Sequence, residues 1–111
     1  MPRKTPLDRV RALCMALPEV TERLSHGSPT WFVRGKKTFV MYLDDHHGDG
    51  RLAIWCAAPP GMQEALVGGE PEHYFRPPYV GHRGWIGVQL NRGLDWNEIA
   101  GAVLVVDRDV R

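Results

Sequence analysis

The sequence contains little cysteine, no long apolar run and almost no net charge, and each of these scarcities excludes a class of protein. Its two cysteines, Cys14 and Cys56, have neither the dense pattern of a secreted disulfide scaffold nor the paired spacing of a zinc site. We therefore expect two buried thiols. No apolar stretch is long enough to cross a bilayer, and the basic N-terminus lacks the apolar segment of a signal peptide. The sequence thus predicts a cytoplasmic protein with no membrane partner.

Positive and negative charges nearly cancel. Lys and Arg number 14 and Asp and Glu number 13, which gives a formal charge of +1. No field of the whole molecule therefore draws the chain onto DNA. The sequence nevertheless has enough hydrophobic residues to form a core, because 43% of the 111 residues are hydrophobic and four are Trp. This composition excludes intrinsic disorder. A chain of this length buries about two thirds of its surface, so we expect one domain over residues 1–111.

Helix signals stand near both ends of the chain. Thr5, with Pro6 at the first helical position, predicts the start of a helix that Pro18 ends. Asp95 and Glu98 form the start signal of a final helix. β-branched residues lower the helix propensity of that last segment, and the sequence leaves its length open.

Between these helices the pattern is that of strands. Residues 31–34 and 38–43 are β-rich runs on either side of a turn that contains Gly, which predicts an antiparallel hairpin. The other predicted elements are a polar loop at 44–50, strands at 51–57 and 84–90, a short helix at 61–67 and an irregular loop at 70–83. Neighbouring strands joined by short turns favour the α+β class, with a helix-flanked antiparallel sheet.

Acidic residues are absent from two windows that are rich in basic and aromatic residues. The first window lies between Glu22 and Asp44, and the second lies between Glu72 and Asp95. Eight of the ten aromatic residues fall inside them. Because cations hold phosphates and flat rings stack on bases, this composition is typical of nucleic-acid binding. An ordinary solvated surface is the alternative, because hairpin tips are commonly charged and strand aromatics commonly belong to the core.

Candidates for catalysis or metal binding are few. His26 and His82 are suited to acid/base work, but neither has an identifiable nucleophile partner. The run DDHHGDG at 44–50 offers metal ligands, yet its spacing matches neither a calcium loop nor a helical His pair, which favours a polar turn. We therefore expect no catalysis, no metal and no cofactor.

Several motifs occur in one order along the chain: ALPEVTE at 16–22, HGSPTWFVRGKK at 26–37, PPYVG at 77–81 followed by GWIGV at 84–88, and DW at 95–96. Together they resemble the MmcQ/YjbR family of small bacterial proteins, over about residues 7–99. The resemblance implies a frataxin-like (CyaY-like) two-layer α+β sandwich, and DNA binding with hairpins that act as a double wing. It does not imply frataxin's iron chemistry, because the first helix lacks an acidic ridge.

We therefore expect a non-catalytic DNA-binding protein that contacts backbone phosphates through a basic hairpin and a basic loop. The residues expected to do so are Arg34, Lys36, Lys37, Arg76, His82, Arg83 and Arg92. One alternative is a pocket for a small anionic or aromatic ligand, lined by Trp31, Tyr79, His82 and Trp85. Another is a protein-interaction module with an exposed apolar patch. A convex basic strip in the fold would favour DNA, whereas inward-pointing cations in a concave site would favour the pocket.

Overall fold

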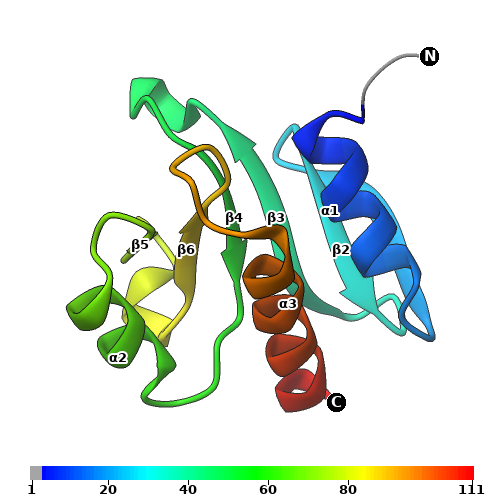
Figure 1. Cartoon of the computed structure of the whole chain (residues 1–111). Coiled ribbons are helices and arrows are strands. Elements are labelled where there is room, and N and C mark those ends of the chain that lie inside the picture. Colours follow the sequence, from blue (N-terminus) through cyan, green and yellow to red (C-terminus); the bar gives the residue numbers. More distant parts are fainter. Residues whose placement is uncertain (1–3) are drawn as a thin grey trace.

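A six-stranded antiparallel sheet and three α-helices make up the fold in residues 4–111, the part that the computed structural model describes (Figure 1). The elements are α1 (Pro6–Met15), β1 (Val20–Ser25), β2 (Ser28–Val33), β3 (Lys37–Asp44), β4 (Leu52–Cys56), α2 (Met62–Gly69), β5 (Tyr74–Phe75), β6 (Ile86–Gln89) and α3 (Trp96–Val110), with 3-10 turns at His46–Gly48 and Gly81–Arg83. The strand order is β1-β2-β3-β4-β6-β5, and every neighbouring pair is antiparallel. The α+β class is confirmed; residues 1–3 of the predicted domain lie outside the described residues.

Both predicted helix starts are confirmed by the capping geometry. In α1, Thr5 Oγ1 accepts a hydrogen bond from the Asp8 amide at 3.1 Å, and the Asp8 carboxylate accepts one from the Thr5 amide at 3.0 Å. In α3, Asp95 Oδ1 accepts from the Asn97 amide at 2.7 Å. The last helix continues to Val110, because burying a valine stabilises by about 1.5–3 kcal/mol, more than its weak helix propensity costs.

The main core lies between the sheet and helices α1 and α3, which cover one face (Figure 1). Alternate residues of each strand point into it, and a register shift after Trp31 lets both Phe39 and Val40 face the helices. Cys14 and Cys56 are free thiols buried in this core, as predicted. Burial raises the pKa of the Cys56 thiol to about 12, so it stays protonated at neutral pH.

The opposite face of the sheet carries a second, smaller apolar cluster. It consists of Leu43, Ala53, Trp55, Phe75 and Trp85. These residues alternate along the strands with those of the main core, as the pleat requires. No helix in the described part of the chain is both long and apolar enough to span a membrane.

Strands β1 and β5 were not predicted, and both are edge strands of the sheet. Most side chains of β1 are exposed or half-buried, so the strand lacks the apolar alternation that predicts strands. Strand β5 has two residues and falls in the segment predicted to be an irregular loop. The short helix predicted at 61–67 is α2, which extends two residues further and ends with Gly68 and Gly69.

A charged cluster joins α1 to the edge of the sheet. Arg11 donates two hydrogen bonds to the Glu22 carboxylate, at 2.8 and 2.9 Å, and Trp31 Nε1 donates a third at 3.1 Å. The hydrogen bond from Arg11 is the main reason that the pKa of Glu22 lies below its ordinary value of 4.5.

Replacing Glu22 with Gln should therefore change how stability depends on pH. Because the folded-state pKa is lowered, the stabilisation is fully present above pH 4.5 and is lost as the pH falls through the lowered pKa. We expect the free energy of unfolding of Glu22→Gln to be about 1 kcal/mol lower than that of the wild type at pH 7. The effect is this small because the cluster is partly solvated. Urea unfolding between pH 2.5 and 7 should show this difference shrinking in acid. A difference that stays constant across the range would contradict the assignment.

Candidate functional site

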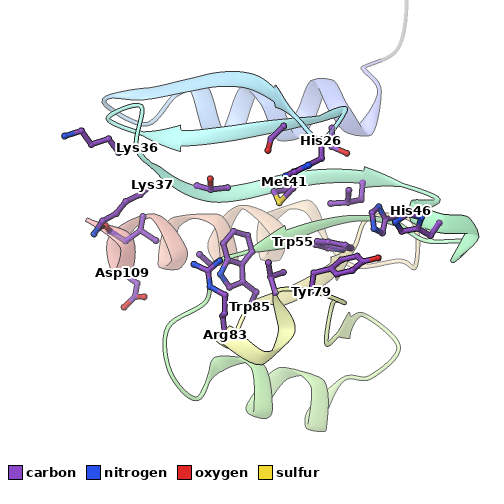
Figure 2. Close-up of a pocket in the computed structure, with 18 residues that line it drawn as sticks. His26, Lys36, Lys37, Met41, His46, Trp55, Tyr79, Arg83, Trp85 and Asp109 are labelled. Atoms are coloured by element: carbon purple, nitrogen blue, oxygen red, sulfur yellow. Dashed lines mark hydrogen bonds between the residues drawn. The ribbon is translucent and has the colours of Figure 1, made fainter.

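A cleft of about 970 Å³ lies on the sheet face that carries the second apolar cluster (Figure 2). Met41 and Leu43 of β3 and Trp55 of β4 form its floor. Val80 and Trp85, from the segment between β5 and β6, line it from the other side. This volume is at the upper end of the range of small-molecule sites, about 300–1,000 Å³.

The aromatic side of the cleft is held by a buried hydrogen-bonded glutamine. Gln63 of α2 donates through Nε2 to the carbonyl oxygen of Gly81 at 2.8 Å and to that of Trp85 at 2.6 Å. Gln63 is 6% exposed, so these bonds are shielded from water. These hydrogen bonds fix the backbone at Trp85. Because Gln63 belongs to α2, this helix positions the Trp85 indole.

Basic residues from both acid-free windows meet at the cleft. Lys36 lies in the turn between β2 and β3, and Lys37 is the first residue of β3, whereas Arg83 comes from the segment before β6 (Figure 2). The Arg83 guanidinium lies 5.7 Å from the centre of the Trp85 ring. Among the lining residues that the structure describes, Asp109 is the one acid. The rim is therefore positively charged beside flat aromatic rings.

Lys37 also caps the C-terminus of α3. Its Nζ donates to the carbonyl oxygen of Val110 at 3.2 Å, where a helix C-terminus attracts cations. Lys36, Lys37 and Arg83 are all exposed, but Lys37 already donates to this carbonyl oxygen. Lys36 and Arg83 are thus the best placed to hold an anion, with Lys37 behind them.

The other residues predicted to contact phosphates lie outside the cleft. Arg34 pairs with Glu19, with Nε and Oε2 3.2 Å apart. Arg76 packs its side chain over Gly81. Arg92 donates to Gln89 and lies in a separate hollow that also contains Glu72 and Asp49. His82 is exposed but does not line the cleft. The predicted residues therefore do not form one continuous strip.

The predicted ligand pocket needs a correction at two of its four residues. Tyr79 and Trp85 line the cleft, whereas Trp31 and His82 do not. Trp31 is fully buried on the helix side of the sheet, where its Nε1 bonds Glu22. Strand alternation places it there, opposite Val40 in the register.

Several cleft residues were not among the predicted site residues, and Trp55 is the most buried of them, at 3% exposure. The sequence does indicate the orientation of the Trp55 side chain. Because Trp55 alternates with the apolar residues Leu52, Ile54 and Cys56, its side chain must face away from the core. His26, His46 and His47 also line the cleft.

The loop at 44–50 forms the predicted polar turn and brings two histidines to the cleft. Asp45 Oδ1 accepts from the Gly50 amide at 2.7 Å, so this carboxylate stabilises the turn. The His46 ring packs edge-on against Trp55 at 4.9 Å and against Tyr79 at 6.0 Å between ring centroids. His47 and Tyr79 lie 6.2 Å apart. Four rings therefore cluster at this end of the cleft.

A group of possible metal ligands lies elsewhere in the described residues. Glu70, Glu72 and His73 have ligand atoms within 4.8 Å of one another. His73 Nδ1 is 3.2 Å from the Glu70 carboxylate, and its Nε2 is 3.1 Å from the Arg92 carbonyl oxygen. Both nitrogens of the ring are thus engaged by the protein; Glu72 is exposed and Glu70 is half-buried.

Comparison with known proteins identifies one family and one similar fold. The YjbR family model matches residues 15–104. The crystal structure of the Deinococcus radiodurans protein DR2400, described as a DUF419 domain, is similar with a TM-score of 0.71 and 17% sequence identity. The similarity covers 91% of this chain and 77% of that chain, and at such identity it concerns the fold alone. Among curated proteins, none matches the chain significantly.

Proposed function

Starting from the fact that the chain belongs to the YjbR family, we propose that it binds nucleic acid by taking a single-stranded segment into the cleft. One observation carries the proposal: Lys36 and Arg83, from the two acid-free windows, line the same cleft as the aromatic rings of Trp55, Tyr79 and Trp85. Cations that hold phosphates beside rings that stack on bases are the two elements of single-strand binding. The proposal contains no chemical step and no cofactor. A cytoplasmic location and a single domain over residues 1–111 remain predictions.

The shape of the site favours an unpaired strand over a duplex. Bases can reach aromatic side chains at the floor of a cleft when they are unpaired, whereas in a duplex they are stacked on one another. A duplex would also need cations spread along its two phosphate backbones. Arg34, Arg76 and Arg92 do not provide this, because they are paired with or packed against neighbouring groups away from the cleft.

Binding should be salt-dependent and should prefer single strands. Fluorescence anisotropy with a labelled deoxythymidine octamer, titrated from 20 to 300 mM salt, measures this. Three cations in contact with phosphates predict a slope of about −2 in log K against log salt concentration. Absence of binding at 20 mM salt would contradict nucleic-acid binding, and a duplex that binds more tightly than the octamer would contradict the single-strand form.

A second candidate is a small anionic ligand with a flat ring. The basic residues lie at a concave site of pocket-like volume and form no convex strip, which is the arrangement expected above for such a ligand. Thymidine monophosphate tests it in the same assay as a competitor. If the cleft binds a nucleic-acid strand, the octamer should bind far more tightly than the mononucleotide, because several of its phosphates and bases contribute. Equal affinities would favour the small ligand.

A further inference from the structure

We propose that the end of the cleft formed by His46, Trp55 and Tyr79, called here the ring subsite, selects bases that carry a ring N–H beside a carbonyl group. This inference rests on the proposed function and names the class of base that the cleft takes. Uracil, thymine and guanine have this pattern on their pairing edge, whereas cytosine has an amino donor beside a ring acceptor.

Two buried nitrogen atoms of the ring subsite have no hydrogen-bond partner among the described residues: Trp55 Nε1 and His46 Nε2. The Trp55 side chain is almost completely buried and lines the cleft. Its N–H group has therefore been removed from water without gaining an acceptor. Because buried polar groups in folded proteins nearly always have a partner, such an exception points to a group that binds there.

The chemistry of the two nitrogens defines a complementary ligand. An indole N–H can only donate, whereas Nε2 of a histidine accepts when the ring proton is on Nδ1, which is the tautomer that this proposal assigns to His46. The two rings are in direct edge contact, with their planes at 78° (Figure 2). A carbonyl oxygen of the base would accept from Trp55 Nε1, and the adjacent ring N–H would donate to His46 Nε2. Cytosine offers the opposite arrangement and leaves both nitrogens unsatisfied.

The loops that carry the other rings of this cluster have a strained backbone. Tyr79 has φ +64° and His47 has φ +50°, in a region that residues other than glycine seldom adopt and that is unfavourable for a bulky ring. Strained residues of this kind cluster at ligand clamps and switch segments. Tyr79 is 69% exposed, so its ring can turn aside and admit a base to the indole.

Octamers of deoxyuridine and deoxycytidine test the ring subsite, because their bases have the same ring size and opposite hydrogen-bonding patterns. We expect the wild type to bind the deoxyuridine octamer at least about tenfold more tightly. Trp55→Phe keeps a flat ring and removes the N–H, so the ratio should fall to near one. Trp96→Phe is the matched control: it removes an indole N–H outside the cleft, and the ratio should persist.

Equal binding of both octamers by the wild type, or an unchanged ratio in Trp55→Phe, would overturn the ring subsite and leave the proposed function standing. Absence of binding to both octamers would overturn the proposed function as well. The same point can be tested by changing the oligonucleotide and leaving the protein unchanged. An octamer of N3-methyldeoxyuridine lacks the ring N–H and should bind about as weakly as the deoxycytidine octamer. Binding as tight as that of deoxyuridine would overturn the assignment of His46.

Discussion

Replacing Gly87 with alanine should lower the free energy of unfolding by about 1–3 kcal/mol, which is the usual cost of overpacking a core. A Cβ at this position would lie 2.3–2.5 Å from three ring atoms of Phe75, the residue opposite Gly87 in the β5–β6 register. Phe75 is 6% exposed, and the Arg51 guanidinium lies 4.1 Å from its ring centre. The ring is thus confined on several sides. Urea unfolding followed by circular dichroism measures the change.

Gly101 provides the matched control, since a Cβ there meets nothing within 4 Å. It lies inside α3, so Gly101→Ala should raise stability by about 0.5–1 kcal/mol through helix propensity. Phe75→Leu should relieve part of the Gly87→Ala defect in the double variant, because the two side chains compete for one space. Additive effects of the two substitutions would contradict the close contact.

Reversing the charges of Lys36 and Arg83 together should weaken binding of single-stranded DNA by at least about 100-fold. Each charge-assisted hydrogen bond to a phosphate contributes about 1.5–3 kcal/mol, and 1.4 kcal/mol corresponds to a factor of ten. The two side chains come from opposite sides of the cleft and are exposed, so the fold should tolerate both changes. Anisotropy titrations of wild type and Lys36→Glu/Arg83→Glu at low salt measure the loss.

The double variant Arg76→Glu/Arg92→Glu carries the same change in net charge on residues outside the cleft. It should weaken binding by several-fold at most, through the general field of the protein. A loss as large as that of the cleft variant would show that binding depends on total charge or on a different surface. That outcome would contradict the cleft as the binding site.

Much of the fold follows from local signals in the sequence. Thr5 and Asp95 mark helix starts because their side-chain oxygens can cap backbone amides. The hairpin around Gly35, which has φ +66°, follows from glycine's freedom in turns. Strands β1 and β5 escape prediction because edge strands need little apolar alternation and gain their pairing from a neighbour that only the folded sheet provides.

The candidate site was only partly predictable, because it depends on which strand face each ring occupies. Tyr79, Trp85 and the cations Lys36, Lys37 and Arg83 were predicted to function, but the sequence could not show that they share one cleft. Trp31 was placed in the pocket by composition, although the alternation of β2 and the irregular register after it direct the side chain to the core. A segment that contains no acidic residue can still lie beside acidic residues of other segments once the chain folds. Arg92 shows this, because it lies in a hollow with Glu72 and away from the cleft.

The four tryptophans offer the most direct test of the cleft, because each indole N–H gives its own signal in a ¹H–¹⁵N NMR spectrum. Trp55 and Trp85 line the cleft, whereas Trp31 lies in the helix-side core and Trp96 lies on α3 beneath Arg9. Titration with a deoxythymidine octamer should shift the Trp55 and Trp85 signals and leave the other two nearly unchanged. Shifts confined to Trp96 or Trp31, or binding that moves none of the four signals, would contradict the cleft as the nucleic-acid site.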